Sequence, residues 1–261
     1  MNLLARPFRK QKPQQPAASP AAQLAIRLPD ASVEIRQIIE EVSADTMTSP
    51  ERIFSLCEAI NYICQSNIPG DIVECGVWKG GSMAAVARTL RLRDACDRKL
   101  WMYDTFEGMS SPDENDVDFL GHSAEQLMAA ADESRSQDRD SIFCNCSLES
   151  VKATLGKTGY PESLLRYVKG KVEDTLTEPT PEQESPTQIA VLRLDTDWYE
   201  STRCELEHLF PRLVPGGVLI IDDYGHWQGC RKAVDEYFAK HSVQMFLHRV
   251  DYTGRLGIKM V

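Results

Sequence analysis

Five acidic side chains stand at the ends of short apolar runs, where strands are expected to stop: Glu74, Asp104, Asp195, Asp222 and Asp223. In a parallel sheet whose strands are joined by helices, ligands bind beyond the carboxyl ends of the strands. Any single acid at such a position can simply cap a helix or turn. Five acids at the ends of four runs indicate a common binding site instead.

Asp195, Asp222 and Asp223 form the first chemical signal. Three carboxylates at adjacent strand ends repel one another unless they are protonated or bridged by a cation. Oxygen donors select a hard ion such as Mg²⁺, which usually keeps several waters. A substrate hydroxyl can replace one water and lose its proton more easily beside the metal. The three aspartates therefore predict a magnesium site that activates a hydroxyl.

A glycine-rich turn, Gly76–Ser82, forms the second signal and follows an apolar run that contains Glu74. Glycine lets the backbone turn sharply and approach a ligand closely. The spacing differs from the GxGxxG fingerprint of dinucleotide-binding proteins. The Glu74 carboxylate would repel a pyrophosphate, but it can hold a cationic or amino ligand. Asp104, at the end of the next run, is placed to accept hydrogen bonds from ribose hydroxyls.

Hydrophobic periodicity predicts the elements that position these residues. From about residue 31 to residue 66 the spacing is helical, and Ser49-Pro50 opens a helix that Pro69-Gly70 ends. After residue 70, apolar runs alternate with amphipathic segments, which favours a parallel sheet covered by helices on both faces. The expected strands span residues 71–75, 100–103, 164–168, 189–194 and 218–221.

The C-terminus departs from this alternation. Residues 243–252 and 255–261 are strand-like and are joined only by Thr253-Gly254, a link that permits only an antiparallel hairpin. The sequence thus predicts a disordered arm over 1–22, N-terminal helices over 23–69 and one α/β domain over 70–261. Within that domain, residues 107–163 are too long for an ordinary connection. We expect an insertion there, either a lid over the site or a solvated segment without a role.

Composition narrows the class of partner. The chain has 261 residues, 42% of them hydrophobic and 26% charged, which is typical of a globular protein. Its net charge of −10 does not favour binding to nucleic acid or to an anionic membrane, because both attract clustered cations. The eight cysteines form no CxxC pair, and we recognise neither an export signal nor a membrane span. We therefore expect reduced thiols and a cytoplasmic location.

Four blocks of the sequence resemble one known family: Asp71–Gly81, Tyr103–Gly108, Leu192–Thr202 and Gly217–Tyr224. They are similar to the macrocin O-methyltransferase (TylF/MycF/NovP-like) family of class I methyltransferases dependent on S-adenosylmethionine (SAM). The resemblance implies a Rossmann-like α/β fold with a seven-stranded, mostly parallel sheet that ends in a C-terminal antiparallel hairpin. It also implies a helical N-terminal extension and a lid-like insertion.

The same resemblance implies a function. Family members use Mg²⁺ and SAM to methylate sugar hydroxyls of natural products such as macrolides and aminocoumarins. We therefore expect a small hydroxylated acceptor, no nucleic acid or membrane partner, and a homo-oligomer. Two alternatives stay open, a non-catalytic SAM-binding protein and a nicotinamide-dependent oxidoreductase.

The resemblance also implies roles for single residues. Glu74 and the Gly76–Ser82 loop would contact the methionine part of SAM, Asp104 the ribose, and Glu173 or Asp174 would lie near the adenine. The full set of implied cofactor-binding residues is Glu74, Gly76, Val77, Gly80, Ser82, Asp104, Thr105, Phe106, Glu173 and Asp174. The implied metal ligands are Asp195, Asp222 and Asp223. Asp195 is also the implied catalytic base, and Asp197 competes for that role.

Overall fold

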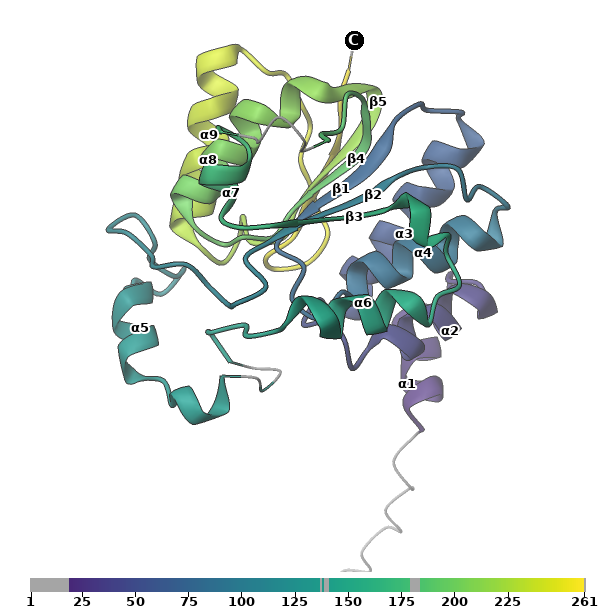
Figure 1. Cartoon of the computed structure of the whole chain (residues 1–261), viewed down its shortest axis with the longest axis horizontal. Helices are drawn as coiled ribbons and strands as arrows, with labels where there is room; N and C mark the ends of the chain where they lie inside the picture. Colours follow the sequence, from purple (N-terminus) through teal and green to yellow (C-terminus); the bar gives the residue numbers. More distant parts are fainter. Residues whose placement is uncertain (1–18, 137, 139–140, 179–183, 261) are drawn as a thin grey trace, which may run out of the picture.

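A computed structural model describes residues 19–136, 138, 141–178 and 184–260 of the chain. These residues form three layers, with one sheet between two groups of helices (Figure 1). The seven strands lie in the order β3-β2-β1-β4-β5-β7-β6, in which β1 to β5 are parallel and β7 is antiparallel to both of its neighbours. The predicted α/β class, the mostly parallel sheet and its antiparallel end are therefore confirmed.

The strands lie close to the predicted positions. They are β1 Asp71–Cys75, β2 Leu100–Asp104, β3 Leu165–Lys169, β4 Ile189–Leu194, β5 Leu213–Ile221, β6 His248–Arg249 and β7 Arg255–Ile258. Two differ in extent. β5 starts earlier than expected, because the segment before Val218 already pairs with β4 through Leu213. β6 is shorter than expected, because only His248 and Arg249 pair with β7.

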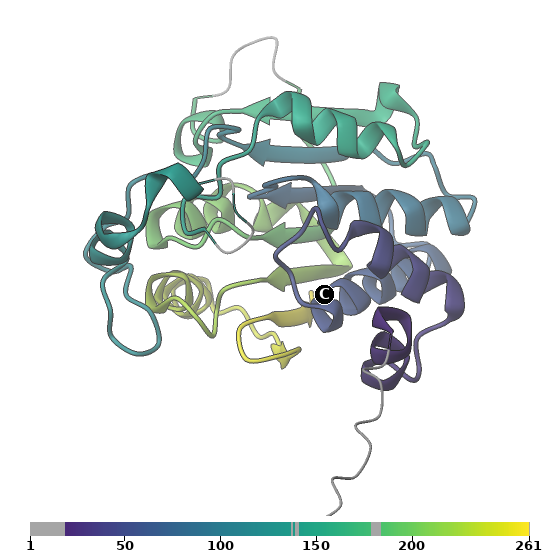
Figure 2. The same cartoon turned by 90° about the horizontal axis from the view of Figure 1, so that it is seen from below.

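Helices cover both faces of the sheet (Figures 1 and 2). One face carries α7 Val172–Thr175, α8 Tyr199–His208 and α9 Gln228–His241, and the other carries α3 Pro50–Gln65, α4 Gly81–Leu92 and α6 Leu148–Gly156. The N-terminal helices α1 Pro20–Arg27 and α2 Val33–Val42 pack outside α3 and α4. The short helix α5 Ala124–Ala130 lies off the carboxyl ends of the strands.

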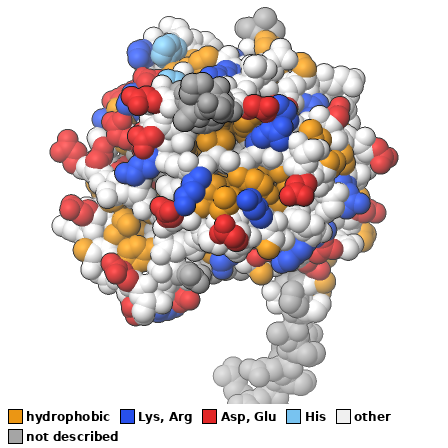
Figure 3. Space-filling view, in the orientation of Figure 1, with side chains coloured by type: hydrophobic (Ala, Val, Ile, Leu, Met, Phe, Trp, Pro, Cys, Tyr) orange, Lys and Arg blue, Asp and Glu red, His pale blue; other side chains and the backbone are white. Residues whose placement is uncertain are grey.

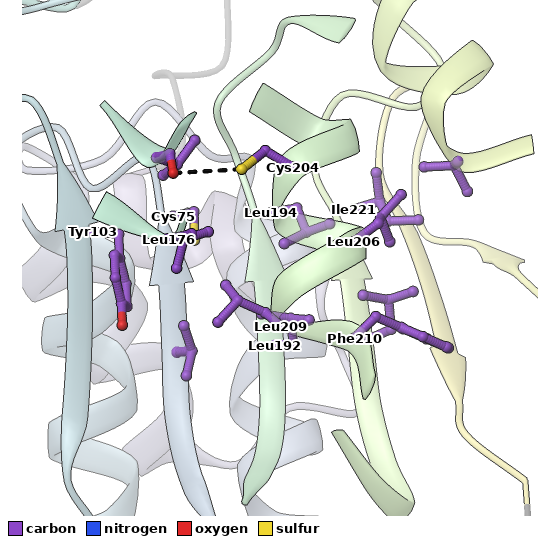
Figure 4. Packing of buried hydrophobic residues seen from close by; sticks show 14 of the residues in the cluster. Cys75, Tyr103, Leu176, Leu192, Leu194, Cys204, Leu206, Leu209, Phe210 and Ile221 are labelled. Atoms are coloured by element: carbon purple, nitrogen blue, oxygen red, sulfur yellow. Dashed lines mark hydrogen bonds between the residues drawn. The ribbon is translucent and has the colours of Figure 1, made fainter. Parts of the chain in front are cut away.

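The apolar core divides into a cluster on each face of the sheet. Figure 4 shows the first cluster, where Leu192 and Leu194 of β4 lie near Leu206 of α8 and near Leu209, which directly follows that helix. Every residue of β4 is buried, as expected for a central parallel strand covered on both faces. One member of this strand, Arg193, is charged, and its partners define the site described below.

Two predicted boundaries differ from the structure. Helix α1 begins at Pro20, inside the range assigned to a disordered arm, and the Ser19 hydroxyl caps it by accepting a hydrogen bond from the Ala22 amide. Residues 1–18 of that arm lie outside the described residues. In the predicted insertion, α6 is the crossover helix between β2 and β3, because Val151 and Leu155 are buried in the core. The described residues between 107 and 147 are the part that extends over the strand ends.

The surface carries charges of both signs. On the face in Figure 3, Lys and Arg side chains are interspersed with Asp and Glu around a group of hydrophobic side chains. Among the described residues, we find no helix that combines the length and the hydrophobicity needed to cross a bilayer.

Candidate active site

A cavity of about 730 Å³ opens at the carboxyl ends of the central strands. The glycine turn after β1 and the ends of β2, β4 and β5 line it, together with parts of 107–147 and of the segment between α2 and α3. Four of the five acidic positions, Asp104, Asp195, Asp222 and Asp223, thus share one cavity with the glycine turn. The cavity lies at the edge where a parallel sheet binds ligands.

The glycine turn is fixed by two tertiary contacts. Gly76 has a φ of +81°, and a Cβ atom at this position would overlap the carbonyl oxygen of Asp195. The amides of Val77 and Trp78 donate to Asp104 Oδ2 at 2.6 and 3.1 Å, and the Phe106 amide donates to Oδ1 at 2.7 Å. Burial raises the pKa of Asp104, and these amide donors oppose that rise. Asp104 therefore joins the glycine turn to the end of β2.

Arg193 is a buried cation that holds three carboxylates. Its Nη1 donates to Glu74 Oε1 at 2.5 Å and to Asp195 Oδ2 at 2.7 Å, and its Nη2 donates to Asp222 Oδ1 at 2.7 Å. A further bond from Nη2 reaches Thr48 Oγ1 at 2.8 Å. Burial raises the pKa of Glu74 to about 8 despite the arginine beside it. The buried guanidinium therefore fixes the positions of the acidic side chains at the ends of β1, β4 and β5.

Asp195, Asp197 and Asp223 form a carboxylate cluster on the cavity wall. One oxygen from each lies within 4.8 Å of the others. Burial, opposed by Arg193, raises the pKa of Asp195 to about 7. Burial and the neighbouring Asp223 carboxylate raise the pKa of Asp197 well above its ordinary value. Asp223 Oδ2 is buried and finds no hydrogen-bond partner among the described residues. An oxygen-only donor set with an unpartnered buried oxygen fits a hard divalent cation.

The third member of this cluster differs from the sequence prediction. Asp222 was expected beside Asp195 and Asp223, but its two oxygens are ion-paired with Arg193 and with Arg52 of α3. Asp197 stands in the cluster instead. Successive residues at a strand end point to opposite faces, so Asp222 turns toward Arg193 while Asp223 faces the acids. Asp197 has a φ of +69°, an uncommon backbone conformation for a residue other than glycine.

Six of the ten predicted SAM residues line a cavity. Gly76, Val77, Ser82 and Asp104 line the large cavity. A second cavity of about 60 Å³ adjoins the same turn, and Thr105 and Glu173 line it.

Four predicted SAM residues line neither cavity: Glu74, Gly80, Phe106 and Asp174. Glu74 is buried against Arg193, and Phe106 is part of the apolar core. Gly80 faces Leu155 of α6 rather than the open space.

Sequence reasoning named no site residue in the N-terminal segment. Thr46, Met47, Thr48 and Arg52 all line the large cavity. The sequence did contain a signal for these residues. Arg193 lies in the middle of the apolar strand β4 and therefore requires buried polar partners, one of which is Thr48. Trp78 lies in the predicted Gly76–Ser82 loop but was not named as a cofactor-binding residue. Its indole lines the cavity, and its Nε1–H is buried without a hydrogen-bond partner among the described residues.

Comparison with known proteins agrees with this architecture. The profile described as Macrocin-O-methyltransferase (TylF) matches residues 39–256. The chain is 34% identical over 212 residues to a tetracenomycin-C 4'-O-methyltransferase of Streptomyces olivaceus, covering 81% of this chain and 74% of that protein. It is 32% identical over 211 residues to the mycinamicin III 3''-O-methyltransferase of Micromonospora griseorubida, covering 81% and 77%.

A solved structure is similar as well. The O-methyltransferase NovP superposes with a TM-score of 0.69 at 31% sequence identity, covering 83% of each chain. The family match spans most of the sequence, including the glycine turn, all four acidic strand ends and Arg193. This chain is therefore an O-methyltransferase that belongs to the macrocin O-methyltransferase (TylF) family.

Proposed function

We propose that this chain transfers the methyl group of SAM to a sugar hydroxyl of a glycosylated small molecule, with a divalent cation such as Mg²⁺ at the carboxylate cluster. One observation carries the proposal: the glycine turn and the Asp195–Asp197–Asp223 cluster line the same cavity. The relatives support the acceptor class. All three are named as O-methyltransferases of small molecules, and the name of the Streptomyces olivaceus enzyme describes a tetracenomycin-C that carries a rhamnosyl group.

The chain's own residues divide into a donor side and an acceptor side. On the donor side, Gly76 and Val77 lie where the methionine part would bind, Asp104 serves the ribose, and Glu173 lies in the adjoining small cavity. SAM, when bound, supplies a methyl group attached to a sulfonium sulfur. The neutral thioether SAH is a good leaving group when that methyl group is transferred. The protein's task is therefore to align donor and acceptor and to provide an oxyanion.

On the acceptor side, the cluster would hold the cation, which lowers the pKa of a hydroxyl beside it. Asp195 is suited to accept the hydroxyl proton, because its carboxylate lines the cavity at the cluster. Arg193 orients the carboxylate through Oδ2 and keeps it at the end of β4.

Release of S-adenosylhomocysteine (SAH) from SAM, Mg²⁺ and a panel of glycosides tests the proposed activity. We expect turnover to stop with EDTA and return with Mg²⁺. Asp195→Asn should retain SAH binding and lose about 10²-fold or more in turnover. Metal-independent turnover, or full activity of the variant, would contradict the proposal. Binding of SAM without SAH release would indicate a non-catalytic SAM-binding protein, and a titration with NAD would detect an oxidoreductase.

The ligand set has its own test. Mn²⁺ binding, followed by electron paramagnetic resonance, separates the cluster in the structure from the trio expected from the sequence. We expect Asp197→Asn to weaken Mn²⁺ binding by at least about tenfold, because one of three charged donors is lost. Asp222→Asn should weaken it less, because Asp222 is ion-paired with Arg193 and Arg52. The reverse order would restore Asp222 as the ligand.

The remaining expectations stay predictions. They are a homo-oligomeric state, a cytoplasmic location and the lack of a nucleic acid or membrane partner.

A further inference from the structure

Three aromatic rings gather beside the carboxylate cluster. Phe119, His226 and Tyr252, named here the aromatic rim, come from three separate segments of the chain. Their ring centroids lie 5.4 Å apart for Phe119 and His226, 6.1 Å for Phe119 and Tyr252, and 6.0 Å for His226 and Tyr252. Phe119 and Tyr252 are each 54% exposed. Large aromatic faces left in water at one place are typical of a binding surface.

Specific contacts hold the rim in place. The loop that carries Phe119 is fastened to the start of α9 by a bridge between Asp118 and Trp227, and the Gln228 amide donates to the Val117 carbonyl at 2.8 Å. On the other side, the hydroxyl of Thr253, next to Tyr252, donates to the Asp222 carbonyl at 2.6 Å. The loops that carry the rings are therefore held by hydrogen bonds to the start of α9 and to the end of β5.

The rim is continuous with the candidate active site. His226 and Tyr252 line the large cavity together with Asp195, Asp197 and Asp223. The His226 amide donates to the Asp223 carbonyl at 2.9 Å, so the ring starts one turn from the cluster. Because Phe119 and Tyr252 are exposed, the rim marks a solvent end of the cavity. An acceptor with its hydroxyl at the cluster and a bulk larger than one sugar can therefore reach these rings.

We propose that the aromatic rim is the subsite for the aglycone of the acceptor, and that it takes a flat, uncharged ring system. This inference rests on the proposed function, because it assumes that a sugar hydroxyl lies at the carboxylate cluster. Rings at these separations favour offset or edge-to-face packing with a further ring. An anionic aglycone would approach the carboxylates of Asp222 and Asp223. The rim thus favours an aromatic or otherwise planar neutral scaffold over an acidic group.

A pair of matched probes tests the subsite by binding alone. Phenyl α-L-rhamnoside and methyl α-L-rhamnoside share one sugar and differ only in the aglycone. Calorimetric titration of the full chain with SAH and Mg²⁺ should give about fivefold tighter binding of the phenyl glycoside. Phe119→Ala and Tyr252→Leu should each reduce that preference to less than about twofold, since each removes one aromatic face.

Phe246→Ala is the control, because Phe246 is 82% exposed and lines neither cavity. It should keep the full preference for the phenyl glycoside. Equal affinities in the unmodified chain, no binding of either glycoside, or a preference that survives both rim variants would overturn the inference. Failure of the proposed function gives a different result. In that case the chain would still prefer the phenyl glycoside and the rim variants would still lose that preference, but no SAH would be released from SAM.

Discussion

Replacement of Arg193 by methionine should destabilise the fold more than any exchange of a surface arginine. The guanidinium is 3% exposed and lies 2.5 to 2.7 Å from oxygens of Glu74, Asp195 and Asp222. Methionine replaces the apolar stem of the arginine side chain but leaves those carboxyl groups buried without their cation. Removal of one partner from a buried ion pair costs about 3–5 kcal/mol. We expect a loss in this range from a total stability on the order of 10 kcal/mol.

Urea unfolding followed by tryptophan fluorescence measures this loss directly. The matched control is Arg203→Met, because Arg203 also holds two carboxylates, Glu200 and Glu207, but is 41% exposed. Exposed pairs contribute at most about 1 kcal/mol, so the control should lose far less. Equal losses in the two arginine variants would refute the view of Arg193 as the buried counter-ion of the site.

Two further predictions concern the cluster and the glycine turn. The pKa of Asp195 rises from 3.8 to about 7 on folding without metal, so between these values the folded state binds more protons than the unfolded state. The stability of EDTA-treated protein should therefore fall as pH rises from about 4 to 7. Mg²⁺ should stabilise the protein more at pH 8 than at pH 5. A stability in EDTA that rises between pH 4 and 7 would contradict the raised pKa of Asp195. Gly76→Ala should cost on the order of 3 kcal/mol or more in urea unfolding, because its Cβ overlaps the Asp195 carbonyl. Gly121→Ala should cost only about 1–2 kcal/mol, because φ is +92° there but, chain neighbours aside, no described atom lies within 4 Å of the added Cβ. Similar losses in the two alanine variants would show that the close approach of the backbones is unimportant.

Local patterns in the sequence were sufficient for the sheet and for the edge at which the site lies. Short apolar runs that alternate with amphipathic segments specify buried parallel strands, because period and length are properties of the chain itself. The two-residue link at Thr253-Gly254 allowed only an antiparallel return, and β7 does pair antiparallel with β6. Acids at the run ends, with a glycine turn after the first, located the ligand-binding edge for the same reason.

Helix boundaries in the insertion were less readable. Residues 107–163 carry few apolar side chains, so α6 was not separated from the rest. Only its packing against α4 shows that Val151 and Leu155 belong to the core. Similarly, Thr48 and Arg52 reach the site from a segment whose sequence carries no recognisable ligand motif.

Which carboxylates meet was decided by the tertiary structure. The sequence placed Asp195, Asp222 and Asp223 at strand ends, but it could not state which charge each would face. Asp222 lies against Arg193 and against Arg52, a residue 170 positions away in the sequence. Asp197 completes the cluster through a left-handed turn that follows β4. Periodicity fixes which residues reach an edge of the sheet, whereas the pairing of charges at that edge depends on distant segments that only folding brings together.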